Sequence, residues 1–468
     1  MPSSVNRQYT ACSVPLKYAA QQAMILTTML TPTNQWPGTS HYAAELGAQR
    51  RCCSPAKGRI HHDILVVGGG LAGLSTALSL TERGITDIAI CEAGQPGDGA
   101  SGRNGGFVFA GYSLSNEALT RQAGLSQGRQ LHQWTQHAVG LVRRRIDQWD
   151  IDCQANDAGV LLADWFGDDA SMLSFRQRMQ DTLRFRLDWI APSELPDHIR
   201  TRRYGGALHE PGSFHFHPLR YINGLIRVLQ ERGVTLYGDT PIQSIKPPSQ
   251  SHRLGADRWQ AVTEQATLSA DQIVLTTGGY DRGVWPRLTR AVLPIATYIA
   301  TTEPLGDDLA RLLPNGHAVY DNRFAFDYYR PLPDTRLLWG GRISTRARRP
   351  DAIRRLLKAD LARVFPSLSE VKFEHAWGGW MGYTRHQMPI LGQPQTGLWH
   401  ATGFGGHGMA PTALAGEVLA EAMSGDETRL RAYQRWQPAW AGGLAGRGWA
   451  QATYAWLNLK DAWRDRVR

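Results

Sequence analysis

The sequence predicts an α/β protein built from two interleaved parts, one around a parallel sheet and one around a mixed sheet. The first observation is an apolar run, residues 63–67, that leads directly into a glycine cluster and then into helical spacing of apolar residues. The second is that strand-like and helix-like segments alternate along the rest of the chain without an internal repeat. The third is that no low-complexity linker divides the 468 residues, which favours interleaved over consecutive domains.

Composition excludes several classes of protein. A hydrophobic content of 42% and a charged content of 20% are typical of a folded chain, and no run reaches the ~18 consecutive apolar residues of an integral membrane span. The five cysteines are too few and too scattered for a disulfide framework and lack metal-ligand spacing. We therefore expect no metal site and a reducing, cytoplasmic environment.

The formal net charge of +10 belongs to the two ends of the chain. Residues 1–60 hold six basic residues and one acidic residue, and residues 426–468 hold eight basic and four acidic residues. The body between them is close to neutral, which gives no support to nucleic-acid binding.

Both ends of the chain differ in amino-acid composition from the residues between them. Residues 1–60 predict a partly disordered extension without Asp or Glu up to residue 44, and two interpretations stay open: a mitochondrial targeting peptide, or an upstream extension with translation starting at Met24 or Met29. Residues 426–468 predict a helical tail in which Trp449, Trp456 and Trp463 recur every seven residues. This stripe is expected to dock on the protein's own body, with a dimer seam or a membrane-surface face as the alternatives.

Residues 63–92 predict one complete βαβ unit. Residues 63–67 are a buried strand, a helix begins near Leu71 and runs to residue 83, and Gly84 stands at its C-cap. Residues 85–91 form the second strand, which ends at Glu92. The whole unit takes about 30 residues, as such units do.

The turn of this unit has the spacing of a dinucleotide-binding site. Its G-x-G-x-x-G glycines allow a tight turn, close approach of a pyrophosphate and close helix–strand packing; they are Gly68, Gly70 and Gly73. The helix N-terminus at Leu71 and Ala72 directs N–H groups and a positive dipole at the phosphates. Glu92, 19 residues after Gly73, suits an adenosine ribose hydroxyl, which argues against NADP and leaves FAD and NAD in a Rossmann-like domain.

Two further glycine-rich loops favour FAD, because a long, bipartite cofactor needs close backbone approach at distant points. The first loop spans residues 97–106, and its predicted contacts are Ala100, Ser101, Arg103, Asn104, Gly105 and Gly106. The second opens a helix over residues 411–423, where the helix dipole stabilises a reduced ring, and its predicted contacts are Gly403, Gly405, Gly406, His407 and Gly408. An ordinary surface loop remains the alternative for the first.

The remaining elements lead to a partition of the chain. Helices are predicted over residues 131–149 and 218–231, and strands over residues 234–237, 270–277 and 337–341. The cofactor domain is expected at residues 61–150, 211–290 and 376–425, and the mixed-sheet substrate domain at residues 151–210 and 291–375.

At this point the motifs resemble the FAD-dependent amine and amino-acid oxidoreductases of the D-amino-acid oxidase superfamily, and within it the gamma-glutamylputrescine oxidoreductase family. Residues 41–44 (HYAA), 212–218 (GSFHFHP), 326–330 (FDYYR) and 336–341 (RLLWGG) are similar to that family's segments, and the resemblance runs from about residue 38 to the end. It adds Ala93, Ile242 and Gly278 to the predicted FAD contacts. Residues 378–381 (GGWM) and Ala410-Pro411 depart from the family pattern.

The resemblance implies amine oxidation. Hydride passes from the carbon bearing nitrogen to flavin N5, water hydrolyses the imine, and oxygen or a quinone reoxidises the cofactor. FAD is expected to be non-covalent, because the first loop has Arg103-Asn104 where covalent relatives have His, and no Cys lies beyond Cys153. The predicted substrate is gamma-glutamylputrescine or a similar polyamine-derived amine. Alternatives are an amino-acid or sarcosine-like oxidase or dehydrogenase, an NAD-dependent dehydrogenase and a non-catalytic flavoprotein subunit.

Three residues are candidates for substrate positioning. His407 lies between glycines where it would touch ring or substrate, or else orders the turn as a packed histidine. Arg330, with Tyr328, is expected on a strand of the substrate domain and would anchor a carboxylate, with a surface salt bridge as the alternative. His215 and His217 are expected to share a strand face and to be structural.

Overall fold

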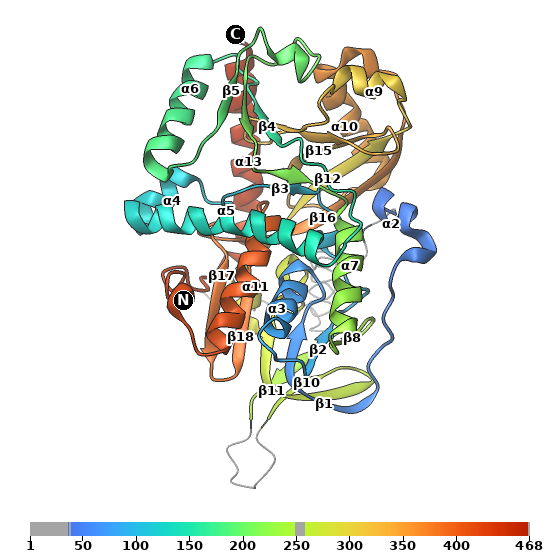
Figure 1. Cartoon of the computed structure of the whole chain (residues 1–468), viewed down its shortest axis with the longest axis vertical. Helices are drawn as coiled ribbons and strands as arrows, with labels where there is room; N and C mark the ends of the chain where they lie inside the picture. The colour runs from blue at the N-terminus through green and yellow to red at the C-terminus, as the bar shows by residue number, and fades with distance from the viewer. Residues whose placement is uncertain (1–35, 37–38, 249–257, 467–468) are drawn as a thin grey trace, which may run out of the picture. The chain divides into compact units, whose positions relative to one another are not determined.

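The computed structural model describes residue 36, residues 39–248 and residues 258–466, and these form two large sheets (Figure 1). The first sheet has the order β17-β18-β11-β1-β2-β8, and β10 joins β9 to β11. Its strands are β1 (Gly58–Val67), β2 (Ile88–Cys91), β8 (Thr235–Tyr237), β9 (Ser244–Lys246), β10 (Trp259–Val262), β11 (Ala266–Leu275), β17 (Ile390–Gln395) and β18 (Leu398–Thr402). Parallel pairing of β1 with β2 and β11, and of β11 with β18, makes the centre of this sheet parallel.

The predicted βαβ unit forms the middle of this sheet. Helix α3 (Leu71–Thr81) joins β1 to β2, and every one of its residues is buried. Helix α11 (Met409–Met423) packs across α3 at Gly416, where an added Cβ would lie 2.5 Å from the backbone carbon of Ser75. α3 is covered by both sheet and helix, which explains why its sequence holds only apolar or small residues and no charge.

The second sheet is mixed and has the order β16-β12-β15-β14-β13-β4-β6-β5. Its strands are β4 (Val160–Ala163), β5 (Asp188–Ile190), β6 (Ala207–Glu210), β12 (Val292–Thr302), β13 (Ala318–Asp321), β14 (Tyr328–Pro331), β15 (Leu337–Ser344) and β16 (Phe373–Thr384). One face carries Tyr329 and Trp339 into a core with α10 (Pro350–Val364). The opposite face carries Val160, Ala318 and Tyr328, which pack on Phe107.

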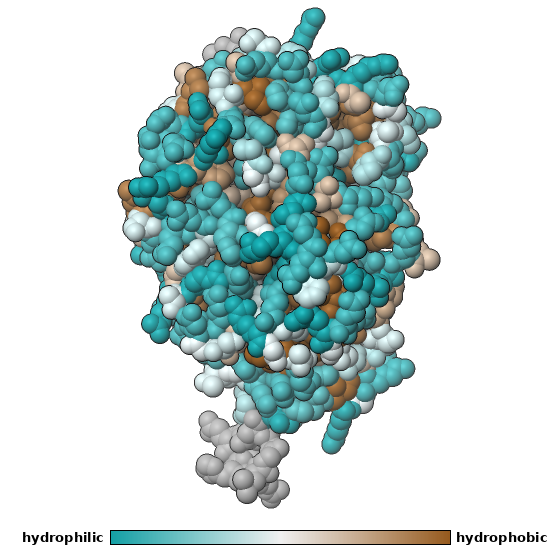
Figure 2. Space-filling model, in the orientation of Figure 1, coloured by the Kyte–Doolittle hydropathy of each residue, from teal (hydrophilic) through white to brown (hydrophobic). Residues whose placement is uncertain are grey.

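Short elements connect the two sheets. Phe107 belongs to β3 (Phe107–Val108), which pairs with β7 (Phe214–His215). The other helices are α2 (His41–Leu46), α4 (Asn116–Ala123), α5 (Leu125–Gln148), α6 (Asp169–Arg178), α7 (Pro218–Glu231), α8 (Pro286–Thr289), α9 (Asp307–Leu312), α12 (Thr428–Arg431) and α13 (Gly443–Arg466). Within the described residues no helix is long and apolar enough to cross a membrane, and the face seen in Figure 2 is mostly hydrophilic with scattered apolar residues.

The elements named from sequence are present, with shifted ends. Helix α7 has the predicted bounds, α5 begins six residues before the predicted Leu131, and α11 begins two residues before the predicted Pro411. The predicted return to the cofactor domain at residue 376 is wrong by about one strand, because β16 pairs along its length with β12. A partner strand some 80 residues away leaves no trace in local periodicity.

The two ends of the chain also differ from expectation. Residues 1–35, 37 and 38 of the predicted extension lie outside the described residues, but α2 follows at once and buries Tyr42 completely. His215 and His217 do not share a strand, because His217 caps α7 by accepting from the Arg220 N–H. The prediction that the tryptophan stripe docks on the body is wrong, since Trp449, Trp456 and Trp463 are each more than 60% exposed.

Candidate active site

Most of the residues predicted to bind cofactor meet at one edge of the first sheet. Gly68 follows β1, Glu92 follows β2, Gly278 lies just beyond β11 and Gly403 follows β18. These strands run parallel, so their carboxyl ends open at the same edge, which is where ligands bind in such sheets. Ile242 is buried in the core cluster that holds Val67 and Cys91, the last residues of β1 and β2.

The first glycine turn tolerates no side chain at two of its positions. Gly68 has φ +116°, and a Cβ there would lie 2.7 Å from Thr276 Oγ1. A Cβ at Gly73 would lie 2.0 Å from the Gly68 carbonyl oxygen. The turn therefore brings strand and helix into backbone contact. The N–H groups at the start of α3 consequently lie next to the ends of the strands, where an anion could bind them.

The Glu92 carboxylate is buried at this turn. It accepts hydrogen bonds from the Gly69 N–H at 2.7 Å and the Gly94 N–H at 3.2 Å. Burial raises its pKa, and the two backbone donors oppose that shift. Each carboxylate oxygen keeps a lone pair for a further donor, as a ribose diol requires.

The loop over residues 97–106 is folded by its own polar side chains. Ser101 Oγ accepts from the Leu71 N–H at 2.9 Å and so joins the loop to the α3 N-terminus. Asn104 donates to the carbonyls of Ala100 and Ser101, and its Oδ1 accepts from the Gly106 N–H at 2.8 Å. These bonds give the loop a defined backbone path beside the first glycine turn.

Arg330 holds this loop from the second sheet. Its Nε donates to the Gly105 carbonyl at 2.7 Å, and its Nη2 donates to the Phe216 carbonyl at 2.9 Å and the Tyr42 hydroxyl at 3.2 Å. The residue is 2% exposed. Both predicted roles, carboxylate anchor and surface salt bridge, are unsupported by this geometry, because the guanidinium donors serve backbone carbonyls inside the protein.

Arg103 lies in the same loop, and one of its guanidinium nitrogens has no acceptor among the described residues. Its Nε donates to the Gly378 carbonyl at 2.7 Å, while Trp377 Nε1 donates to the Arg103 carbonyl at 3.0 Å. Its Nη2 is buried and has no hydrogen-bond partner among the described residues. Burial lowers the pKa of this guanidinium. A buried cationic donor without an acceptor indicates a missing anionic or carbonyl oxygen.

The second glycine turn, residues 403–408, is held by Ser113. The Ser113 hydroxyl donates to the Phe404 carbonyl at 3.1 Å and accepts from the His407 N–H at 3.3 Å. A Cβ at Gly405, where φ is +59°, would lie 2.3 Å from the same hydroxyl oxygen. The turn leads directly into α11, whose N-terminal end therefore sits at the edge where the parallel strands finish.

His407 is surrounded by apolar and aromatic groups. Its ring contacts Phe109 edge-on at 4.4 Å, and burial lowers its pKa to about 4. The imidazole is therefore neutral at physiological pH. Phe109 in turn stacks on Tyr320 at 5.6 Å, and Tyr320 contacts Phe326, which contacts Tyr328.

A carboxylate absent from the sequence-based candidates lies beside these rings. Glu210 Oε1 accepts from the Ala110 N–H at 3.1 Å, and no other described group donates to this carboxylate. Burial raises its pKa to about 7. Glu210 and Ala318 both pair with Val160, so Glu210 shares a sheet face with Tyr320 two residues along β13. No motif marks Glu210, because its neighbours come from distant strands.

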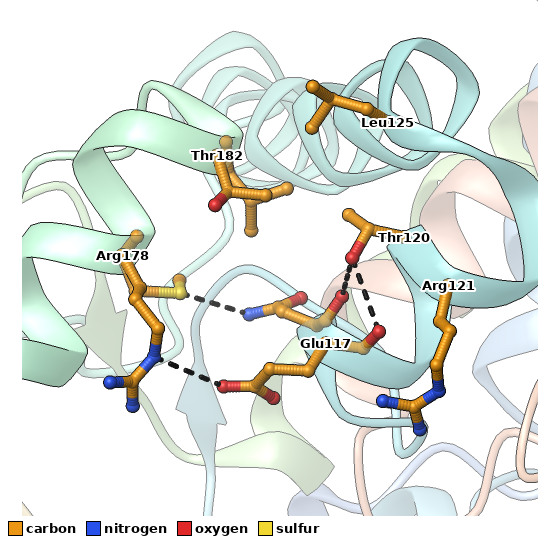
Figure 3. Close-up of a pocket in the computed structure, with 9 residues that line it drawn as sticks. Glu117, Thr120, Arg121, Leu125, Arg178 and Thr182 are labelled. Atoms are coloured by element: carbon orange, nitrogen blue, oxygen red, sulfur yellow. Dashed lines mark hydrogen bonds and ion pairs between the residues drawn. The ribbon is translucent and has the colours of Figure 1, made fainter.

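A separate surface pocket of about 340 Å³ lies between α4, the start of α5 and the end of α6 (Figure 3). Glu117 and Arg178 face one another there at 4.0 Å, and Leu125 covers one side. None of the residues predicted to bind cofactor or substrate lines it. Within the described part of the chain, no group of three or more His, Cys, Asp or Glu side chains is arranged to hold a metal.

Comparison with known proteins identifies the family. The family model described as DAO, FAD dependent oxidoreductase, matches residues 63–422. The chain is a member of the DAO family. Gamma-glutamylputrescine oxidoreductase of Escherichia coli is 32% identical over 79% of this chain and 85% of its own length. The probable oxidoreductase OrdL of Rhizobium meliloti is 28% identical over 91% of this chain and 98% of its own length.

Several solved structures share the fold of this chain. Glycine oxidase from Geobacillus kaustophilus superposes with a TM-score of 0.64 at 22% identity, covering 79% of this chain and 96% of its own. L-proline dehydrogenase from P. horikoshii gives 0.65 at 16% identity, covering 82% and 98%. The chain is thus an FAD-dependent oxidoreductase of the DAO family, with a parallel-sheet FAD domain and a mixed substrate sheet.

The residues present fit the FAD that the family implies. The cramped glycine turn admits a pyrophosphate but no side chain. The Glu92 carboxylate has acceptor capacity for ribose hydroxyls, and the buried Arg103 Nη2 has no acceptor without a ligand. Backbone N–H donors in the turns, a carboxylate acceptor and one cation are the groups that a dinucleotide with a flat ring requires.

Proposed function

We propose that this DAO-family enzyme oxidises a C–N bond of a cationic amine, with gamma-glutamylputrescine or a similar polyamine-derived amine as the best substrate. Membership of the DAO family supports the reaction class of this proposal, the oxidation of amines and amino acids. The 32% identity to the Escherichia coli enzyme, over most of both chains, supports the finer part.

The observation that carries the substrate class is Glu210 beside an aromatic cluster. Its carboxylate has one backbone donor, and Tyr320 and Phe109 lie next to it on the side of the second glycine turn. A carboxylate flanked by ring faces binds an ammonium group by charge and by cation–π attraction. The substrate nitrogen would therefore lie beside the Glu210 carboxylate and close to the rings of this cluster.

FAD would span the edge of the first sheet. The turn at Gly68–Gly73 and Glu92 would hold its pyrophosphate and adenosine, while the loop with Arg103 and the turn with His407 would hold its ring system. The predicted contacts Ala93, Ile242 and Gly278 line the same strand ends. Attachment is proposed to be non-covalent, and FAD should therefore leave the protein on acid denaturation.

The chemistry is a two-electron oxidation of the substrate. When bound, FAD would supply the acceptor for the hydride on the carbon that bears nitrogen, and oxygen or a quinone would reoxidise it. The amine must first lose its ammonium proton to solvent water so that its lone pair can form the C=N bond. Water then adds to the imine carbon, and the C–N bond breaks to a carbonyl and a free amine. Glu210 would orient the substrate nitrogen. His407 is neutral and so adds no positive charge beside the cationic substrate.

An amino-acid or sarcosine-like oxidase is the second candidate function. Amino-acid substrates need a cation for their carboxylate, and Arg330 is occupied by the Gly105 and Phe216 carbonyls. Arg330 therefore gives no support to this class, and the Glu210 carboxylate would repel the carboxylate of an amino acid. A non-catalytic flavoprotein subunit would keep the same glycines and is distinguished by reactivity alone.

Anaerobic titration of the purified yellow protein tests the proposal. Gamma-glutamylputrescine and putrescine should bleach the flavin bands, whereas glycine and sarcosine should bleach them slowly or not at all. Faster bleaching by glycine or sarcosine would favour the second candidate. A yellow protein that no amine bleaches would refute catalysis, and a protein that neither contains nor takes up FAD would refute the cofactor assignment.

A further inference from the structure

The C-terminal helix α13 is docked through its polar side. Gln451 Oε1 accepts from the Ser344 hydroxyl and from the Thr345 N–H, and Arg447 donates to the Thr345 carbonyl at 2.6 Å. Nearly three turns after Gln451, the Asp461 carboxylate accepts a hydrogen bond from the Phe324 N–H at 2.8 Å. Contacts at positions 447, 451, 454, 461 and 465 recur at helical spacing and so define one face of α13.

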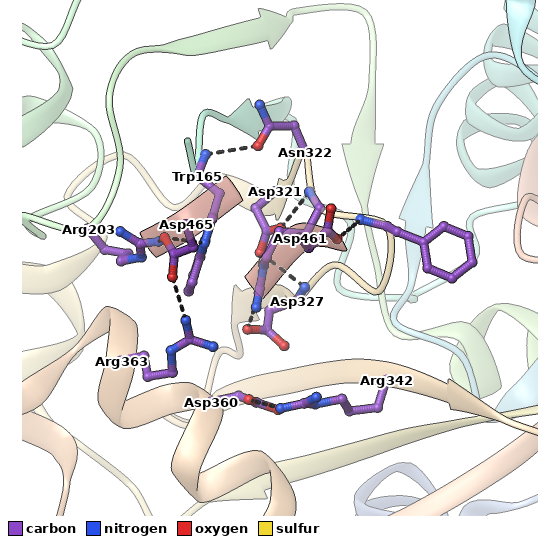
Figure 4. Close-up of polar contacts among 12 residues, drawn as sticks. Trp165, Arg203, Asp321, Asn322, Asp327, Arg342, Asp360, Arg363, Asp461 and Asp465 are labelled. Atoms are coloured by element: carbon purple, nitrogen blue, oxygen red, sulfur yellow. Dashed lines mark hydrogen bonds and ion pairs between the residues drawn. The ribbon is translucent and has the colours of Figure 1, made fainter. Parts of the chain in front are cut away.

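Asp465 makes the strongest of these attachments (Figure 4). Its carboxylate accepts from Trp165 Nε1 at 3.1 Å and from Arg363 at 3.0 Å, and it pairs with Arg203. Arg203 and Arg323 also lie over the Trp165 ring, at 3.7 and 3.6 Å from its centroid. Arg363 of α10 and Arg203 of the loop before β6 therefore hold the end of the helix in a fixed rotation about its axis.

The opposite face of α13 is apolar and exposed. Trp449, Trp456 and Trp463 are 78%, 61% and 69% exposed, and Leu459, about one turn from both Trp456 and Trp463, is 69% exposed. None of the helix residues is buried. The three tryptophans span about 21 Å at the 1.5 Å rise per residue of a helix. An amphipathic helix that turns its polar side inward presents a surface for something outside the chain.

Charge on α13 is separated in the same way. Its two acidic residues, Asp461 and Asp465, both face the body. On the outer side Lys460 and Arg466 are exposed, and Lys460 Nζ lies 5.9 Å from the Trp456 ring. The outward surface of the helix therefore consists of tryptophan, leucine, alanine and basic residues. Among the described residues of the helix, none on this outward side carries a carboxylate.

We propose that this face of α13 binds the surface of an anionic lipid membrane. Tryptophan is enriched at the boundary between headgroups and acyl chains, and basic residues beside such a face are attracted to anionic headgroups. A helix lying in the plane of the interface would insert its three tryptophans to a shallow depth without crossing. An enzyme held there has direct access to electron acceptors dissolved in the bilayer, quinones among them.

The charge pattern favours lipid over a second copy of the chain as the occupant. A symmetric pairing through this face would place Lys460 and Arg466 of both copies along one seam, with no outward carboxylate on the helix to oppose them. An anionic headgroup layer supplies the opposite charge along the whole length of the helix.

Flotation of the full-length holoprotein with vesicles tests the proposal. Vesicles of phosphatidylcholine alone are compared with equal parts of phosphatidylcholine and phosphatidylglycerol. The protein should float with the anionic vesicles and stay below with the neutral ones. The double variant Trp456→Ser/Trp463→Ser should lower the partition coefficient at least about tenfold. Lys460→Gln/Arg466→Gln should lower it by about fivefold per cation. Leu125→Ser, another exposed apolar residue at 54%, is the matched control and should float like the parent.

Brominated lipids give a second readout. They should quench the fluorescence of the three stripe tryptophans among the 16 in the chain, and the tryptophan variant should lose that quenching. The proposal is overturned if the parent ignores anionic vesicles, or if both double variants float as well as it does. It is also overturned if light scattering shows a dimer that the tryptophan variant dissociates, because a second copy then covers the face. Amine bleaching of each variant, measured without lipid, shows that its flavin site is intact.

Discussion

Replacing Glu210 by Gln tests the proposed substrate site most sharply. The amide keeps an oxygen for the Ala110 N–H, whose bond to Glu210 is 3.1 Å long, so the local fold is retained while the negative charge is lost. A hydrogen bond between charged groups contributes roughly 1.5–3 kcal/mol, and each 1.4 kcal/mol is about tenfold. We expect kcat/KM for a cationic amine to fall roughly 10- to 100-fold, mainly through KM.

The pH profile adds a signature that a merely structural role would not give. Burial raises the pKa of Glu210 to about 7, and the ionised form is the one that attracts an ammonium group. For the parent enzyme, kcat/KM should therefore rise with pH up to about 7, and this limb should be absent in Glu210→Gln.

The same substitution should stabilise the protein. A carboxyl group whose pKa rises on folding contributes its stability below the unfolded value of 4.5 and loses it as the pH rises through about 7. The shift corresponds to at most roughly 3 kcal/mol. Glu210→Gln should thus raise Tm above about pH 7 and leave it unchanged near pH 4.5.

Steady-state kinetics across pH and thermal unfolding of the same preparations measure both effects, with the exposed Glu264→Gln as the control. An unchanged kcat/KM for every amine would refute the assignment of Glu210 to the substrate, even if Tm rises. A fall in kcat/KM that is equal for cationic and uncharged substrates would refute its role in recognising charge.

Substitutions at three other residues test cofactor binding, support of the glycine-rich loop and contact with the flavin ring separately. Gly73→Ala should abolish FAD binding, measured by flavin absorbance, because its Cβ would lie 2.0 Å from the Gly68 carbonyl oxygen. Retained flavin would show that the turn can open. Arg330→Met should destabilise the protein in urea unfolding by about 1–3 kcal/mol for each of the two carbonyls left without a donor, and Arg330→Lys should not restore it, because one ammonium cannot copy the fork. Full stability of either would contradict the loop-holding role. His407→Asn should lower kcat without moving the limb near pH 7, since the His407 pKa is about 4; loss of that limb would assign it to His407 instead.

His407 also has a definite sign in stability. Its pKa is depressed from 6.5 to about 4, so the fold favours the neutral ring. Its contribution is present above about pH 6.5 and is lost as the pH falls toward 4. Acid unfolding of His407→Asn should accordingly begin at lower pH than that of the parent.

Local sequence patterns were sufficient for the cofactor half of this protein. The βαβ unit, its glycine turn and Glu92 lie within about 30 residues, and each follows from backbone sterics or side-chain periodicity along one stretch of chain. The same holds for α7 and for the helix after the second glycine turn. That these pieces meet at one edge follows from the parallel direction of their strands.

The substrate half depends on partners far apart in the sequence. Nothing near Arg330 indicates that its guanidinium serves carbonyls at Gly105 and Phe216, and nothing near Glu210 indicates the rings of Phe109 and Tyr320. The packing of the β3–β7 pair and its flanking residues against the mixed sheet, and not spacing along the chain, brings these groups together.

The tryptophan stripe shows the division most clearly. Its seven-residue period is visible in the sequence and determines that the three rings share one face of a helix. Which face turns outward was decided by tertiary contacts, because Asp461 and Asp465 find donors on the second sheet and fix the rotation of α13. Periodicity specifies a face; only the partner surface specifies where that face points.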